Sequence, residues 1–207
     1  MTLRSAWTPV KSPRSTPRLL TVVWRGRGPF PALLGIILIA GSLFVWTNLL
    51  RADREMRDDL LQQARLVAQT VSIERLKSLT GTPADHTDPT YLRLKAQFAA
   101  TLTAHPGWRF IYLTGRAHDG HIFFYLDSEP AGSKDESPPG QSYADADAEE
   151  YRAFDSGIAQ TTGPHRDTWG TWVSALVPLI DPIEGTPLAV LGVDIDATNW
   201  TWDVARS

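Results

Sequence analysis

The longest apolar stretch of the chain runs from Gly28 to Leu50 and contains no charged residue. Its 23 residues meet the requirement of a helix that crosses a bilayer, which is roughly 20 residues. Trp24 and Trp46 lie near its two ends, where amphipathic rings suit the membrane interface. A cleaved signal peptide is the alternative, but its apolar core is shorter, at about 7–15 residues. We therefore expect an uncleaved transmembrane helix over residues 28–50.

A helical stripe of apolar residues follows among charged and amide side chains. Leu60, Ala64, Val67 and Val71 are spaced four, three and four residues apart, which is the period of one helix face. The stripe either packs on the chain's own sheet or pairs two chains as a coiled-coil seam. We favour packing on the chain's own sheet, because the pattern lasts for only about two heptads.

A second helix is predicted over YLRLKAQFAATLTAH, residues 91–105. Asp88 suits the N-cap and Pro89 the first turn, and Pro106-Gly107 ends the helix. One side of this helix carries four large apolar residues: Tyr91, Leu94, Phe98 and Leu102.

Beyond Gly107 the period changes to two, which is typical of strands. A first hairpin is predicted from WRFIYLTG (108–115) and HIFFYLDS (121–128), and a second from TWVSALVPLI (171–180) and TPLAVLGVDI (186–195). Between the hairpins lie a loop of nearly twenty residues and a helix over 148–157, and a short helical segment ends the chain. This order predicts an α+β fold in which helices flank a small antiparallel sheet.

The charge is divided along the chain. Residues 1–50 carry six basic side chains and no acidic one, whereas residues 51–207 carry 14 basic and 23 acidic ones. A basic segment before a span stays in the cytoplasm, so everything after Arg51 is expected outside. The six charges are too dispersed for a nucleic-acid-binding patch, and the absence of Cys excludes disulfides and thiol chemistry.

Two acids at the end of AVLGVDID, Asp194 and Asp196, raise the question of chemistry. Both share one strand face with Val190 and Gly192. A metal site would need further oxygen or nitrogen ligands nearby, and none is local. Asp196 can instead cap the last helix, and either acid can mark the place where a buried strand meets water.

Other motifs are also explained without catalysis. His118 and His121 have a spacing seen in metal sites, but they flank an Asp-Gly hairpin turn. Residues 145–150, DADAEE, lack the Gly and terminal Glu of a calcium loop and suit an acidic first helical turn. No phosphate loop, GxSxG elbow or HExxH motif occurs. We therefore expect no catalytic residue, no metal and no cofactor.

The order of these parts carries a resemblance over roughly residues 45–203. Its elements are a span that leads into a long helix, then RFIYLTG, FFYLDSEP, PPGQSY and SALVPLIDPIEGTPLAVLGVDID. The chain resembles the extracytoplasmic sensor domains of bacterial membrane receptors of the single Cache family, which are PAS-like and of the citrate-sensor type. The resemblance implies a PAS-like sheet, small-molecule sensing, and an output such as a sensor histidine kinase of a two-component system.

On this basis the chain divides into four parts. Residues 1–27 form a basic cytoplasmic tail, 28–50 a transmembrane helix, 51–203 a periplasmic or extracellular sensor domain, and 204–207 the start of a connector to a second span. The expected location is the bacterial inner membrane, crossed once in this chain. The expected partners are the bilayer, a small polar ligand and a second copy of the chain; nucleic acid is not expected.

The resemblance also implies ligand-binding positions. In similar citrate and fumarate sensors, the strand before the long loop and the penultimate strand contact the ligand, and these positions match Tyr125, Ser128 and Ser174. Neighbouring candidates for the pocket are Tyr112, Arg109, Asp127, Trp169, Trp172 and Asp194. Carboxylate sensors carry Arg or His at several of these positions, so a dicarboxylate ligand is not favoured.

Two functions from different classes remain open. The first is a ligand-sensing receptor domain with a cavity of converging Tyr, Ser and Asp groups. The second is a membrane-tethered module that dimerises or docks a periplasmic partner without a small ligand. In the second case the aromatic residues of the strands only form the core, which is their usual place.

Overall fold

The computed structural model describes residues 30–206, so the expected basic tail over residues 1–27 lies outside the described residues. Helix α1 spans Phe30–Gln69 without interruption. One unit of the chain ends at Leu43, and a second, compact unit begins at Phe44. By length and composition, α1 qualifies as a helix that can cross a membrane, and its apolar side chains before Leu50 are largely exposed.

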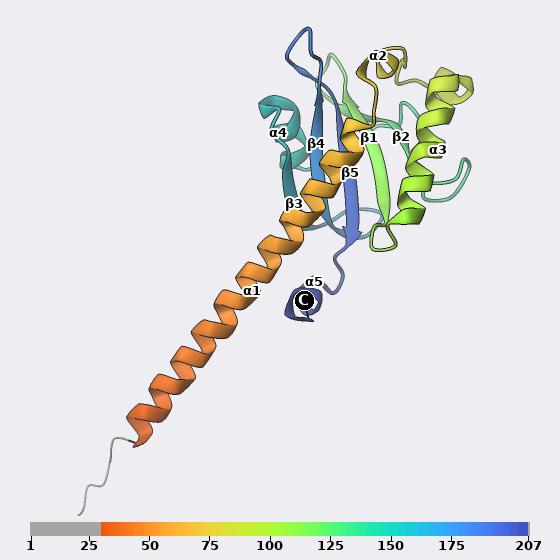
Figure 1. Cartoon of the computed structure of the whole chain (residues 1–207). Helices are drawn as coiled ribbons and strands as arrows, with labels where there is room; N and C mark the ends of the chain where they lie inside the picture. The colour runs from red at the N-terminus through yellow and green to blue at the C-terminus, as the bar shows by residue number, and fades with distance from the viewer. Residues whose placement is uncertain (1–29, 207) are drawn as a thin grey trace, which may run out of the picture. The chain divides into compact units, whose positions relative to one another are not determined.

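The second unit is built on a five-stranded antiparallel sheet with the order β2-β1-β5-β4-β3 (Figure 1). Its strands are β1 (Phe110–Arg116), β2 (Ile122–Asp127), β3 (Gln160–Arg166), β4 (Thr171–Ile180) and β5 (Pro187–Asp196). The two predicted hairpins, β1–β2 and β4–β5, are present, and β5 pairs with β1 to join them. The predicted α+β class is therefore confirmed.

Strand β3 was missed by the sequence prediction. Its segment contains Gly163-Pro164, and the register with β4 shifts between Thr162 and His165. A Pro cannot donate to a sheet ladder and is therefore confined to edges and bulges. β3 is an edge strand, so only its position in the sheet makes this sequence compatible with a strand.

One face of the sheet is covered by α1 and by α3 (Pro89–Ala104). The stripe of Leu60, Ala64, Val67 and Val71 is buried in one apolar cluster with Leu191 and its neighbours. The preferred interpretation of the stripe, packing on the chain's own sheet, is confirmed, and an expected homodimer has to use other surfaces. The short helices are α2 (Ile73–Leu76), the 3-10 turn η1 (Pro83–Thr87) and α5 (Trp200–Arg206).

The opposite face carries α4 (Ala148–Ser156) and a second apolar cluster (Figure 1). Asp147 caps α4 by accepting from the backbone N–H of Glu150 at 2.8 Å, and Gly157 ends it with a φ of +65°. Val190 belongs to this second cluster, whereas Leu191 and Val193 belong to the first. The alternation along β5 is therefore as the period-two pattern predicts.

Candidate functional site

A small cavity lies on the α4 side of the sheet. Its volume is about 30 Å³, and since a water molecule needs roughly 10–15 Å³ of such space, about two waters fit. Six aromatic rings line the cavity: Phe110, Tyr112, Phe124, Tyr143, Trp169 and Trp172. Its other lining residues are four acids and one serine: Asp127, Asp135, Asp167, Asp194 and Ser137.

The three central strands form the floor of this cavity. Phe110 on β1 pairs with Asp194 on β5, and Tyr112 pairs with Gly192. A Cβ atom at residue 192 would lie 2.1 Å from the Tyr112 ring. The absence of a side chain at Gly192 therefore allows the Tyr112 ring to lie over β5, next to Asp194.

The aromatic walls pack on one another in edge-to-face arrangements, the geometry that the ring quadrupole favours. The ring centroids of Phe110 and Trp172 are 5.2 Å apart at 72°, and those of Tyr112 and Phe124 are 5.8 Å apart at 72°. Tyr143 packs on Phe124 at 4.7 Å. Each of these walls is therefore held by another ring.

Asp194 is a buried acid of the lining, with 5% of its surface exposed. Its Oδ1 atom has no hydrogen-bond partner among the described residues, and neither has the Oγ atom of Ser174, which pairs with it across β4 and β5. Burial raises the pKa of Asp194 to about 7, against the opposing effect of the nearby Ser174 and Tyr112 hydroxyl groups. Such a carboxyl group changes charge near neutral pH.

Asp196, two residues later on β5, has a different environment. It is exposed, and its Oδ1 atom accepts from the backbone N–H of Thr198 at 2.8 Å. Hydrogen bonding from the Thr198 side chain, together with this backbone N–H group, holds the pKa of Asp196 below its ordinary value. Asp196 forms a turn ahead of α5 and does not cap it, because α5 begins only at Trp200; the predicted N-cap role is corrected.

Asp167 holds the indole ring of Trp172 and the backbone of Trp169. Its Oδ1 atom accepts from the backbone N–H groups of Trp169 and Gly170 and from the indole N–H of Trp172, at 2.8, 2.9 and 2.8 Å. The turn between β3 and β4 is thereby tied to the wall that it supplies.

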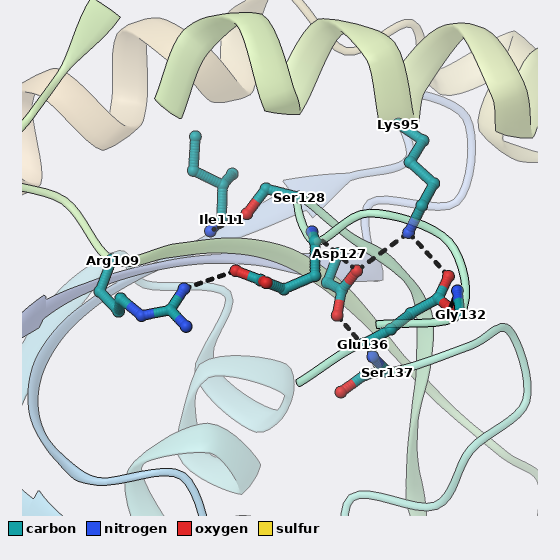
Figure 2. Close-up of polar contacts among 9 residues, drawn as sticks. Lys95, Arg109, Ile111, Asp127, Ser128, Gly132, Glu136 and Ser137 are labelled. Atoms are coloured by element: carbon teal, nitrogen blue, oxygen red, sulfur yellow. Dashed lines mark hydrogen bonds and ion pairs between the residues drawn. The ribbon is translucent and has the colours of Figure 1, made fainter. Parts of the chain in front are cut away.

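The long loop between β2 and α4 is held by a buried ion-pair network (Figure 2). Lys95 on α3 pairs with Asp127 at 3.1 Å and with Glu136 at 2.9 Å. Asp127 also accepts from the backbone N–H of Ser137, and Glu136 from that of Gly132. The network fixes the part of the loop that brings Ser137 to the cavity.

A further buried acid, Glu150, lies on α4 near the same face of the sheet. The hydroxyl group of Thr114 on β1 donates to Glu150 Oε1 at 2.6 Å. Burial raises the pKa of Glu150 to about 8, with smaller contributions in the same direction from Asp147 and Asp194. Two acids behind one sheet face thus have strongly raised pKa values.

The structure brings together five of the nine predicted site residues: Tyr112, Asp127, Trp169, Trp172 and Asp194 line the cavity. Ser174 lies beside Asp194 but does not line the cavity. Arg109 pairs with Asp135, a lining residue, at 2.9 Å, and also with Glu129.

Tyr125 and Ser128 do not line this cavity, so their expected part in ligand binding stays a prediction. Tyr125 packs on the α1 and α3 side of the sheet, 4.9 Å from Phe123 between ring centroids. A register shift between β1 and β2 puts Phe124 on the cavity side instead. Ser128, directly after β2, is tied to β1, because its Oγ atom accepts from the backbone N–H of Ile111 at 3.1 Å.

Several lining residues were not predicted. Phe110 shares the parity of Tyr112 on β1, so strand alternation was a signal that identifies it. Tyr143 and Asp167 lie in irregular segments, where no periodic pattern predicts direction. Across residues 30–206, no group of three or more His, Cys, Asp or Glu side chains is arranged to hold a metal ion.

Comparison with known proteins places the fold. No family model and no curated protein sequence matches the chain. The sensory domain of the Campylobacter jejuni chemoreceptor Tlp3 (CcmL) has a similar structure, with a TM-score of 0.55 and 14% identity over 86% of this chain and 68% of that chain. The same domain with isoleucine bound gives a TM-score of 0.56 at 14% identity, and its complex with L-valine gives 0.55 at 13%, each over 87% of this chain and 68% of the other. The chain thus has the fold of chemoreceptor sensory domains.

Proposed function

We propose that this chain is the extracytoplasmic sensing part of a membrane-bound bacterial signal-transduction receptor, and that its cavity binds a small polar molecule. The observation that carries this proposal is a buried carboxylate, Asp194, with an unpartnered oxygen atom in a cavity walled by aromatic rings. Small-molecule sites are concave, mostly apolar, and contain a few directed polar groups. The similar sensory domain binds L-valine and isoleucine, which supports a small molecule as the ligand.

The finer assignment follows the resemblance of the sequence. In this proposal the domain over residues 51–203 is of the single Cache kind, residues 28–50 span the inner membrane, and residues 1–27 are cytoplasmic. Its signal passes to an output such as a histidine kinase. The cavity binds its ligand and performs no chemistry.

A membrane-tethered interaction module is the second candidate. The small volume of the cavity and the mutual packing of its rings favour it, because a ligand of more than a few atoms requires some wall to move. Trp169 is the wall most suited to this, since it is only partly buried and lies in a turn.

A thermal-shift screen of the full chain in detergent separates the two candidates. A compound that binds only the folded state at 100 times its Kd stabilises it by about 2.7 kcal/mol, which raises the Tm of a chain of this size by roughly 5–10 °C. We expect such a shift from at least one amino acid, organic acid, amine or purine at millimolar concentration. Trp169→Ala should remove most of the shift.

Trp202→Ala is the matched control, because Trp202 is 66% exposed on α5 and does not line the cavity. It should leave the shift unchanged. If no compound shifts the Tm, or if both variants weaken the shift equally, the sensing proposal is wrong and the interaction module is favoured.

A further inference from the structure

We propose that the ligand of this cavity carries a compact positive charge, a protonated amine whose ammonium group lies between Asp194 and the rings of Tyr112 and Trp172. This inference rests on the proposed sensing function and names the chemical class of its ligand. It follows from the charge balance of the lining, from one unpartnered oxygen atom and from the size of the cavity.

The charge balance of the cavity is negative. Four carboxylates line it, and among the residues that the structure describes no Lys, Arg or His side chain does. Asp127 has a basic partner in Lys95 and Asp135 in Arg109, although each cation also pairs with a second acid. Among the described residues, Asp167 and Asp194 have no basic partner. Above the pKa of Asp194, an entering anion therefore meets two uncompensated negative charges, and an entering cation compensates them.

The unpartnered oxygen atom adds direction to this charge. Asp194 Oδ1 is buried and accepts no well-formed hydrogen bond, with only the hydroxyl groups of Ser174 and Tyr112 nearby, and a buried acceptor left unsatisfied is unfavourable, more so if it is charged. The adjacent Ser174 Oγ atom is also without a partner. An ammonium group supplies three N–H donors, which satisfy Asp194 Oδ1 with one and leave others for Ser174 or a water molecule.

The walls suit a cation as well. A cation within about 6 Å of an aromatic centroid is attracted by the negative face of the ring, most strongly by Trp and Tyr. Tyr112 lies over β5 next to Asp194. Trp172 on β4 is the cross-strand partner of Asp196, which follows Asp194 by two residues on β5. The guanidinium group of Arg109 lies 4.0 Å from the ring centroid of Phe110. Because this ring already contacts a cation, we do not include Phe110 in the ammonium site.

The size of the cavity limits which amines can bind. A volume of about 30 Å³ admits an ammonium group and an adjacent carbon atom, since a water molecule needs roughly 10–15 Å³. The rest of the ligand has to extend past Trp169 toward solvent. An α-amino acid is disfavoured, because its carboxylate would enter beside the ammonium group with no cation to receive it.

A matched set of three-carbon compounds tests the charge directly. The full chain in detergent is titrated with propylamine hydrochloride, sodium propionate and 1-propanol at equal ionic strength, with the Tm as readout. We expect a rise with propylamine alone. Asp194→Asn should weaken propylamine binding at least tenfold, whereas Asp196→Asn, two residues away on the exposed strand end, should leave it unchanged.

The outcomes separate this inference from the sensing function. Binding of propionate or propanol in place of propylamine overturns the cationic ligand and leaves sensing intact. The cationic ligand is also overturned, and sensing is left intact, if only non-cationic compounds of the broad screen bind. The same conclusion follows if Asp194→Asn binds propylamine as tightly as the unchanged chain does. Absence of any shift across both experiments overturns the inference together with the proposed function.

A pH titration gives a second measurement that does not depend on a variant. Asp194 is faced by Tyr112 on β1, by Tyr143 in the long loop, by Asp167 in the β3–β4 turn, and by Asp147 and Glu150 at α4. Protonation of Asp194 below pH 7 removes the counter-charge, while an alkylamine stays protonated. The affinity for propylamine should therefore fall about tenfold for each pH unit below 7, and a flat profile between pH 5 and 8 contradicts the inference.

Discussion

At the scale of single residues, burial decides what each acid does. Asp194 and Asp196 are two positions apart on one strand, yet one is buried with a raised pKa and the other is exposed with a lowered pKa. Desolvation disfavours a charged carboxylate, whereas a hydrogen bond to it favours the charge. The same residue type therefore has two roles, a buried acid of the cavity and a turn former.

Glu150 allows the cost of a buried acid to be measured. The raised pKa of Glu150 means that the folded state holds this proton more tightly than the unfolded state. Its contribution to stability is complete below pH 4 and is lost as the pH rises through about 8. Glu150→Gln should therefore stabilise the chain at pH 8.5 by on the order of 2–4 kcal/mol and have little effect at pH 4.

Urea denaturation of both chains across this pH range measures the difference. Glu149→Gln is the control, because Glu149 is only half-buried and pairs with Arg152 on the same helix. It should change the free energy of unfolding by less than about 1 kcal/mol at every pH. A gain from Glu150→Gln that is independent of pH would show that Glu150 is not the titrating group.

At the scale of elements, the long loop after β2 acts as part of the sheet. Its backbone pairs with β2, since Phe124 N–H donates to Gln141 O at 2.9 Å and Tyr143 N–H donates to Ile122 O at 2.8 Å. The edge of β2 is thereby covered, as sheet edges in stable proteins usually are. The pairing also directs Tyr143 onto Phe124 and into the cavity wall.

Lys95 is the residue that holds this loop to α3. Although burial alone lowers the pKa of Lys95, the hydrogen bond with Glu136 and the charge of Asp127 raise it above its ordinary value. Lys95→Met should destabilise the chain by about 3–5 kcal/mol, because it leaves buried carboxylates without a counter-charge. The amides of Gly132 and Ser137, which donate to the same carboxylates, should exchange hydrogen faster.

Arg116→Met is the matched control for this prediction. It also removes a cation from an ion pair, but Arg116 and Asp155 are exposed, with 37% and 63% of their side-chain surfaces accessible. An exposed pair contributes less than about 1 kcal/mol. Equal losses of stability in the two variants would mean that burial does not set the strength of the Lys95 network.

At the scale of the whole molecule, the chain combines an apolar segment with an acidic folded unit. The helix that packs on the sheet from Leu60 onward is continuous in sequence with the apolar segment. Alkaline phosphatase fused after Ser207 should be active in cells, and phosphatase fused after Gly28 should be inactive, because basic residues keep the N-terminal side in the cytoplasm. The reverse pattern of activities would overturn the proposed topology.

Local pattern was sufficient for most elements of the fold. The stripe from Leu60 to Val71 and the alternation of β5 were predicted because apolar residues recur at a regular spacing along each segment. Asp88 was predicted as an N-cap, and its side chain accepts from the backbone N–H of Thr90 at 2.6 Å. β3 was missed because Pro164 breaks the local pattern, and its pairing with β4 depends on a partner distant in sequence.

The sequence by itself determined the apolar segment, the helical stripe, the two hairpins and the face on which Asp194 lies, because each depends on neighbours within a few residues. Only the tertiary structure decided which of two aligned acids is buried, and that Phe124 and not Tyr125 faces the cavity. It also decided that Tyr143 and Asp167, from two irregular segments, meet beside Asp194. The physical reason is that burial and register depend on contacts between segments far apart in the chain, and periodicity along one segment carries no information about them.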